Sequence, residues 1–291
     1  MKAELFYKSN DILGEGAMWH PSLNRFFWVD IEVCMIHEIG LYSDQAVSYN
    51  MPSRVSTIVP DKSDGIVICL KDRISHYSLE TDTLTDLAML EPHLPENRCN
   101  DGKCDPWGRL WFGTMNLNAK RGAGALYSFG AGETLKLKLP NQGIPNGIVW
   151  SSDEKKMYYI DTLDECVKEF FYDKQTGNII FRKIAVQIPG EIGSPDGMAI
   201  DNDGMLWIAH WGGSCLGRWN PGNGKLIDKI TLPVPYITSC AFGGKDGKTL
   251  FITTARYGMP QNELEQYPLS GSIFACVSHK CSGAFPNRFV S

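Results

Sequence analysis

Asp196-Gly-Met-Ala-Ile-Asp201, followed by Asp203-Gly204 and Leu206-Trp-Ile-Ala209, is the stretch of sequence that decides the fold. The same pattern of turn residues and apolar residues returns at Asn100-Asp-Gly-Lys-Cys-Asp105 with Leu110-Trp-Phe-Gly113. A self-similar unit of 20 to 50 residues indicates a solenoid, a propeller or an array, because each unit is one supersecondary element that must stack on its neighbours.

The unit occurs six times. A third clear copy is Asn146-Gly-Ile-Val-Trp-Ser151 with Lys156-Met-Tyr-Tyr-Ile-Asp161, and weaker copies begin at Glu15, Ser56 and Thr238. Between the aligned positions the steps are 41, 44, 46, 50 and 42 residues. Six units of this length fill nearly all of the 291 residues, so we expect one domain over 1–291.

Each unit contains short runs rich in Trp, Tyr, Phe, Ile and Val, separated by turn formers such as Asn202-Asp-Gly204. Four such strands with their turns need about 45 residues, which is the size of one propeller blade. The sequence therefore predicts an all-β fold, a six-bladed β-propeller of four-stranded antiparallel blades. We expect Glu4-Leu-Phe-Tyr7 to close the ring as the outer strand of the last blade, which removes an exposed edge. The segments 116–124 and 256–270 are expected to be loop insertions.

Composition argues against several classes of partner. The net charge is −5 and there is no run of Lys and Arg, so we expect neither a nucleic acid nor a membrane as partner. No apolar stretch approaches the roughly 20 residues of a spanning helix, and the N-terminus lacks a secretory signal. The nine cysteines are scattered singly, which is typical of reduced thiols. These features predict a cytoplasmic protein, a monomer or a weak homo-oligomer.

One residue of every copy falls at the same point of the repeat, and a closed ring would bring these side chains to its axis. All of them are oxygen donors: Glu15, Ser56, Asn100, Asn146, Asp196 and Thr238. Glu15, Asn146 and Asp196 are each followed by Gly, which permits a sharp turn. Two carboxylates and an amide form a hard, all-oxygen ligand set that suits Ca²⁺, Mg²⁺ or Mn²⁺. Since Asp-Gly and Asn-Gly are also common turn dipeptides, the metal hypothesis depends on the shared position in the repeat.

A second cluster of polar residues lies at the start of the copy that contains Asn100. Arg98 and Asn100 lie two residues apart, and a guanidinium over the channel mouth suits a carboxylate, a phosphate or vicinal hydroxyls. The alternative for Arg98 is an ion pair or a clasp on a carbonyl group. Lys103 follows on the same strand, where Asp101 or Asp105 offers it a partner. His210 could line the mouth, although a packed histidine is the commoner situation.

Several of these motifs together resemble the senescence-marker-protein/gluconolactonase/luciferin-regenerating family. The resemblance runs in order from residue 10 to about 280, through Gly14-Glu-Gly-Ala-Met-Trp-His20, Arg98-Cys-Asn-Asp-Gly-Lys-Cys-Asp105, Pro145-Asn-Gly147, Ser194-Pro-Asp-Gly-Met198 and Ala255-Arg-Tyr-Gly-Met259. It implies a six-bladed propeller with one divalent cation in the central channel and a sugar lactone as substrate. The cation could be Ca²⁺, Zn²⁺, Mn²⁺, Mg²⁺ or Fe²⁺, since oxygen ligands discriminate poorly among them.

The resemblance also implies roles for individual residues. Glu15, Asn146 and Asp196 match the family's metal ligands, and Asp196 matches the residue taken as its general base. Arg98 and Asn100 match its substrate-binding pair. The chain departs from the family at Asn118, which stands in a shortened loop where relatives carry a substrate-contacting Glu. The resemblance thus implies the core chemistry but not gluconolactone as the particular substrate.

The expected activity is a metal-dependent carboxylic ester hydrolase that converts a pentono- or hexonolactone to its aldonic acid. Two alternatives stay open at this point. The same all-oxygen site could hydrolyse phosphotriesters or other esters, or the protein could be a non-enzymatic divalent-metal-binding regulator. The regulator would need an exposed apolar or charged patch, and the sequence shows none.

Overall fold

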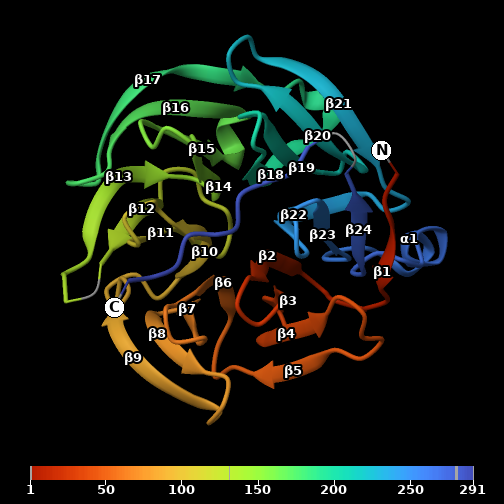
Figure 1. The fold of residues 1–291 in the computed structure, drawn as a ribbon, viewed down its shortest axis with the longest axis horizontal. Coiled ribbons are helices and arrows are strands. Elements are labelled where there is room, and N and C mark those ends of the chain that lie inside the picture. Colours follow the sequence, from red (N-terminus) through yellow and green to blue (C-terminus); the bar gives the residue numbers. More distant parts are fainter. Residues whose placement is uncertain (1, 131, 279–280, 291) are drawn as a thin grey trace.

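The apolar runs of the repeat form antiparallel strands in a computed structural model, which describes residues 2–130, 132–278 and 281–290. Figure 1 shows the sheets arranged around a central axis, with the first strand of each repeat innermost. The chain is an all-β protein, as predicted, and this arrangement is consistent with a β-propeller.

Four sheets have four strands each, paired in chain order with antiparallel neighbours. The first two are β2 (Gly14–His20), β3 (Arg25–Asp30), β4 (Met35–Gly40), β5 (Val47–Asn50), and β6 (Val55–Pro60), β7 (Ile66–Leu70), β8 (Arg73–Ser78), β9 (Thr83–Met89). The other two are β10 (Asn97–Cys104), β11 (Leu110–Asn116), β12 (Gly124–Phe129), β13 (Lys136–Gln142), and β14 (Pro145–Trp150), β15 (Lys156–Asp161), β16 (Cys166–Asp173), β17 (Asn178–Gln187).

A further sheet of eight strands contains the last two copies of the repeat. One half is β18 (Ser194–Ile200), β19 (Leu206–Trp211), β20 (Cys215–Asn220) and β21 (Lys225–Thr231). The other half is β22 (Tyr236–Gly243), β23 (Thr249–Ala255), β24 (Ile273–Val277) and β1 (Glu4–Tyr7). The halves meet through a single residue pair, Trp211 and Tyr236, whose rings also stack at 4.3 Å. The pairing of β1 with β24 confirms that the N-terminal strand completes the last repeat.

In the part of the chain that the structure describes, helical structure is confined to short connections: the 3-10 turns η1 (Thr162–Asp164) and η2 (Gly190–Ile192), and the helix α1 (Gln261–Gln266). The helix α1 lies in the predicted 256–270 insertion. None of the helices formed by the described residues has the length and apolar character needed to cross a membrane.

Apolar side chains between neighbouring sheets make up the core. Phe27 of β3 packs in one cluster with Ile58 and Ile68 of the next sheet, and Trp111 of β11 meets Trp150 of β14 edge to face at 5.9 Å. All nine cysteines are unbridged, and all except Cys34 are buried. Each sheet thus buries its faces against its neighbours, which fixes the innermost strands firmly around the axis.

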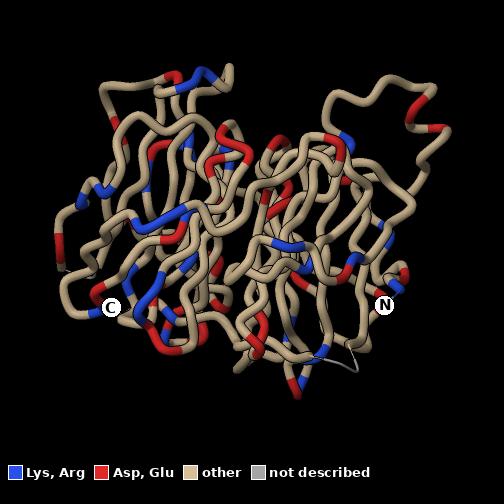
Figure 2. The backbone as a smooth tube through the Cα atoms, turned by 90° about the horizontal axis from the view of Figure 1, so that it is seen from above, with Lys and Arg blue, Asp and Glu red and all other residues tan. Residues whose placement is uncertain are grey.

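The outer surface differs in one respect from the sequence-based expectation that no apolar patch is exposed. Phe171 of β16 and Ile180, Phe181 and Ile184 of β17 are each more than half exposed. Their apolar character did not indicate exposure, because β17 is the edge strand of its sheet and most of its residues, including the consecutive Ile180 and Phe181, are exposed. Lys and Arg are interspersed with Asp and Glu over the molecule (Figure 2).

Candidate metal centre

Every innermost strand has a break in its register at the aligned position of the repeat. In β2 the register shifts directly after Glu15, which itself still pairs with Val29. In the other five innermost strands the shift spans the aligned residue, which is Ser56, Asn100, Asn146, Asp196 or Thr238. At those five positions the bulge leaves the residue out of the ladder and re-aims its side chain. The shared position in the repeat is therefore a shared irregularity of the backbone, not an ordinary turn.

Contacts between successive bulges run around the axis. Thr57 Oγ1 donates to Asn100 O (2.7 Å), Asn100 Nδ2 donates to Pro145 O (2.8 Å), and Thr238 Oγ1 donates to Gly14 O (2.6 Å). A Cβ on Gly147 would lie 2.9 Å from Asp196 O. These contacts place the aligned residues at one level of the channel, and they explain why glycine follows Asn146.

The three predicted metal ligands come together at this level with few protein donors. The carboxylate of Glu15 accepts a hydrogen bond from Gly16 N (3.1 Å), and that of Asp196 from the backbone of Gly197. Asn146 Nδ2 donates to Thr162 Oγ1 (2.8 Å), which leaves its Oδ1 with a long 3.4 Å hydrogen bond from Asn100.

Burial and mutual repulsion act on both carboxyl groups. The pKa of Glu15 is raised to about 8, mainly by burial and in addition by the charge of Asp101, while Arg98 opposes the shift. Burial also raises the pKa of Asp196 well above its usual range, with Glu15 and Asp101 adding to the effect. Acidic groups held close together without a compensating cation are typical of a cation site or of catalytic acids and bases.

The residues present fit a divalent cation. Asp101 Oδ2 is buried without a hydrogen-bond partner, so a third carboxylate, whose charge Lys103 offsets in part, acts on Glu15 and Asp196. Over the described ranges, no three His, Cys, Asp or Glu side chains converge closely enough to hold a metal ion. The candidate set accordingly depends on the amide oxygen of Asn146 as its third ligand.

The predicted substrate pair is present as a unit but is more enclosed than expected. Arg98 is 8 % exposed, and its Nη1 donates to Cys99 O (2.8 Å) and to Asn100 Oδ1 (2.7 Å). The clasp on a carbonyl, which the sequence left as an alternative, is therefore part of its role. Among the described residues Arg98 Nε and Nη2 have no acceptor, so donors are left for a ligand.

Asn118 lies apart from these residues, in the exposed loop after β11. Its backbone N–H donates to Asn116 Oδ1 (3.0 Å). The same loop reaches the neighbouring sheet, where Arg121 Nη1 binds Asp164 Oδ1 at 2.7 Å. Since Asn97 pairs with Asn116, the loop stands at the end of the sheet where β10 begins, close to Arg98.

Sequence reasoning missed two supporting residues. Thr162 accepts from Asn146 and donates to Pro195 O (2.8 Å), so it links two of the strands that carry candidate metal ligands. Asp161 accepts from Gly143 N (2.7 Å) and Ile144 N (2.9 Å), which fixes the backbone leading into Asn146. Both lie one hairpin after the motif that they support, so spacing within a single copy gave no signal for them.

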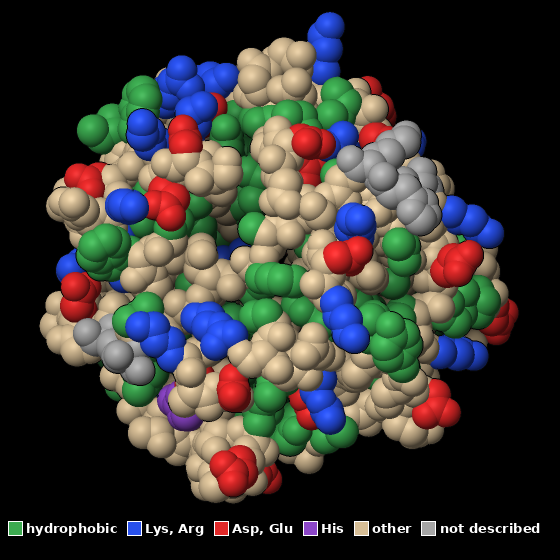
Figure 3. Space-filling model, in the orientation of Figure 1, with side chains coloured by type: hydrophobic (Ala, Val, Ile, Leu, Met, Phe, Trp, Pro, Cys, Tyr) green, Lys and Arg blue, Asp and Glu red, His purple; other side chains and the backbone are tan. Residues whose placement is uncertain are grey.

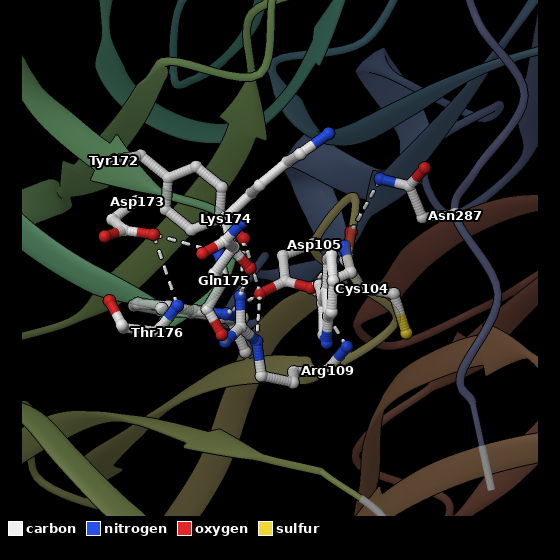
Figure 4. Close-up of polar contacts among 12 residues, drawn as sticks. Cys104, Asp105, Arg109, Tyr172, Asp173, Lys174, Gln175, Thr176 and Asn287 are labelled. Atoms are coloured by element: carbon white, nitrogen blue, oxygen red, sulfur yellow. Dashed lines mark hydrogen bonds and ion pairs between the residues drawn. The ribbon is translucent and has the colours of Figure 1, made fainter.

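The other polar residues singled out in the sequence make hydrogen bonds or packing contacts within the fold. Lys103 Nζ donates to Met198 O, whereas Asp105 binds Arg109 Nε at 2.7 Å instead (Figure 4). His210 is fully buried against Trp219, whose Nε1 donates to it at 3.2 Å. Burial lowers the pKa of His210 to about 4, which keeps it neutral at physiological pH. His210 is thus a packed core histidine.

Comparisons with known proteins agree with this arrangement. Residues 13–256 match the model of the SMP-30/Gluconolactonase/LRE-like region. The chain is 34% identical over 276 residues to the sugar lactone lactonase YvrE of Bacillus subtilis (strain 168), covering 94% of each chain. It is also 34% identical to regucalcin of Homo sapiens over 295 residues, covering 100% of this chain and 99% of the relative.

Solved structures show the same likeness in three dimensions. The crystal structure of a calcium-binding protein, regucalcin, from Agrobacterium tumefaciens str. C58 superposes with a TM-score of 0.95 at 28% identity, covering 100% of this chain and 99% of the other. A luciferin-regenerating enzyme superposes with a TM-score of 0.93 at 28% identity, covering 99% of both chains. The chain therefore belongs to the SMP-30/gluconolactonase/LRE-like family.

Proposed function

We propose that this protein is a metal-dependent hydrolase of sugar lactones, built as a single six-bladed propeller domain. The eight-stranded sheet counts as two blades in this proposal, because one residue pair joins its halves. The observation that carries the proposal is the convergence of Glu15, Asn146 and Asp196 on one bulged level of the channel, beside the buried Arg98–Asn100 unit. The relative YvrE, described as a sugar lactone lactonase, supports the choice of substrate class.

The cofactor in this proposal is one divalent cation held by Glu15, Asn146 and Asp196. The relative from Agrobacterium tumefaciens is described as calcium-binding, and all-oxygen ligand sets also accept Mg²⁺, Mn²⁺, Zn²⁺ and Fe²⁺. A cation bound there supplies Lewis-acid polarisation of the lactone carbonyl.

The chain's own residues perform the remaining work. Asp196 accepts a proton from the attacking water, whose oxygen forms a bond to the lactone carbonyl carbon. The ring C–O bond then breaks, the ring oxygen takes up a proton, and the product is the open hydroxy acid. Burial and acidic neighbours raise the pKa of Asp196 in the metal-free protein. A bound cation would lower that basicity and would also acidify the attacking water, so that Asp196 can take its proton. Asn146 would hold the cation without adding charge.

The substrate is oriented from one side of the channel. Arg98 Nε and Nη2 are free to donate to ring hydroxyls, and the hydrogen bond to Asn100 Oδ1 holds the guanidinium in place. Asn118, from the loop above, is proposed to contact the distal hydroxyls. An amide in place of a carboxylate changes which lactone fits, so the sugar is to be found by experiment.

The test is acid release from a panel of pentono- and hexonolactones, with EDTA-stripped protein and each divalent cation added back in turn. We expect hydrolysis only when a cation is present, and one substrate and cation pair should exceed the others. Phosphotriesters and simple aryl esters are the comparison arm. Turnover of those esters without lactone hydrolysis would overturn the substrate class, and cation binding without any turnover would favour a metal-binding regulator.

A further inference from the structure

The other mouth of the channel is covered by the C-terminal tail, residues 281–290. Figure 1 shows this tail crossing the ring from the last strands towards β10, and Figure 3 shows a hollow among hydrophobic side chains on the same face. Asn202 N donates to Ser282 O (2.8 Å), Asn287 Nδ2 to Cys104 O (3.1 Å), and Phe289 N to Pro60 O (2.8 Å). The tail is thus tied to three different sheets.

A cavity of about 340 Å³ lies beneath the tail. This volume falls within the roughly 300–1,000 Å³ of ordinary small-molecule pockets. Its walls are mostly apolar, with Met18, Ile58, Trp150, Ile200, Phe242 and Phe285 among them. Glu15, Asn146 and Asp196 do not line it, so the cavity is a separate compartment on the far side of the candidate metal centre.

The ammonium of Lys103 is a donor in the wall with unused capacity. Lys103 Nζ donates to Met198 O, which uses one of the three N–H groups of an ammonium. A buried donor without an acceptor is costly, so a ligand that supplies one is favoured.

Two carboxylates also line the cavity. Glu154 at the rim is already bound to Lys174 Nζ (2.6 Å). Asp101 lies towards the metal centre, since its charge acts on Glu15 and Asp196 and it interacts with Lys103. The free capacity on the tail side of the cavity is therefore that of donors and of a cation.

We infer that this cavity is a second ligand site, which binds a small apolar molecule with a single carboxylate. The apolar body lies among the side chains under the tail, and the carboxylate accepts from Lys103 Nζ. Phe285 is 41 % exposed at the rim, where an apolar ligand would cover it. The inference does not depend on the proposed lactonase activity, because no residue of the metal centre takes part.

The test is calorimetric titration of EDTA-stripped protein with octanoate, octan-1-ol and octylammonium. These probes share one apolar chain and differ in the head group, and removal of metal prevents chelation by octanoate. We expect one octanoate per chain, with octan-1-ol about ten-fold weaker and octylammonium weaker still, since a charge-assisted hydrogen bond contributes about 1.5–3 kcal/mol. Equal affinity for octanoate and octan-1-ol, or no binding of octanoate, would overturn the inference.

Substitutions in the cavity wall test whether octanoate binds at this position. Lys103→Met should weaken octanoate at least ten-fold and leave octan-1-ol unchanged, and Lys225→Met, at an exposed lysine of β21, is the matched control. Ala284→Trp, in the exposed part of the tail, should fill the mouth and weaken both probes without touching the core. Octanoate binding that survives both Lys103→Met and Ala284→Trp unchanged would place it elsewhere and refute the site.

Discussion

Asp105 and Asp196 are both buried aspartates of the same repeat, yet their surroundings are opposite. Asp105 ends the innermost strand of its sheet, at the turn into the next strand, and both of its oxygens are saturated. Oδ1 accepts from Trp107 N and Arg109 N (both 2.9 Å), and Oδ2 from Arg109 Nε, Trp111 Nε1 and Tyr172 OH (Figure 4). Asp196, at the start of its strand, has the backbone of Gly197 as donor and two acidic neighbours.

The copy that contains Asp196 repeats the contrast within itself. Asp201 Oδ1 accepts from Asp203 N (3.0 Å) and Met205 N (2.9 Å), and its Oδ2 accepts from Trp207 Nε1 (3.0 Å) and Arg218 Nε (2.7 Å). Asp105 and Asp201 thus stabilise the turns that follow their strands, whereas Asp196, near the start of its strand, has few protein donors and acidic neighbours. The comparison teaches that hydrogen-bond saturation, and not burial or residue type, separates the two structural aspartates from the proposed functional one.

The largest expected effect is on turnover, when Asp196, the aspartate with few hydrogen-bond donors, is replaced. Asp196→Asn should lower kcat about 10²- to 10⁴-fold at saturating cation, because the proton acceptor is lost. The melting temperature of the metal-free variant should stay the same or rise, since a repelled buried charge has been removed. Steady-state kinetics and thermal melts check both parts. Near-normal turnover with cation bound would remove Asp196 from its role.

At Asp105, whose carboxylate oxygens are saturated with hydrogen bonds, the expected effect is on stability and not on turnover. Asp105→Asn should destabilise the protein by about 3–5 kcal/mol, because the Arg109 guanidinium is left buried without its counter-charge. Turnover per folded molecule should be nearly unchanged. Urea unfolding gives the loss of stability. Tyr172→Phe is the mild control, with a cost of about 1 kcal/mol. A stable Asp105→Asn protein would break the distinction between the two aspartates.

The pH dependence of the metal-free protein sharpens the comparison. The folded pKa of Glu15, about 8, lies above its ordinary value of 4.5, so its contribution to stability is fully present below pH 4.5 and is lost as pH rises through about 8. The melting temperature should fall by several degrees over this window and recover when a divalent cation is added. The profile of Glu15→Gln should be flatter. Identical profiles for the two proteins would contradict the assignment.

The smallest effect is expected from the substrate pair. Arg98→Ala should raise KM about ten-fold, equivalent to about 1.4 kcal/mol, with a minor change in kcat, because the guanidinium orients the substrate without taking part in proton transfer. Arg121→Ala is the matched control, since Arg121 is exposed and bound to Asp164 on the same end of the molecule. A loss confined to kcat in Arg98→Ala would indicate a direct role in the chemistry.

The candidate metal centre could be proposed from the repeat itself, and the role of its residues as metal ligands stays a prediction. Glu15, Asn146 and Asp196 share one position in the repeat, and equal units around an axis bring equal positions together. Residues that support the site from a neighbouring hairpin, such as Thr162, could not be predicted in this way. Their effect arises from contact between sheets, and no spacing within one copy records it.

The sequence also did not predict which hydrogen bonds and charges surround each carboxylate. Asp105 and Asp196 both stand next to Pro and near Gly, and local pattern alone does not tell a saturated carboxylate from one without counter-charge. The exposed apolar residues of β17 were missed for a similar reason, since outermost and innermost strands share one composition.

The sequence by itself determined the all-β class, the recurrence of the unit, the closing role of Glu4–Tyr7 and the oxygen donors that face the axis, because periodicity and residue chemistry are local properties. Only the tertiary structure decided that these donors sit on backbone bulges, that Arg98 is clasped beneath Asn100, and that the tail covers an apolar cavity. Those features depend on which sheets are in contact and on which polar atoms remain unpaired after packing. The pattern of residues along the sequence specifies neither.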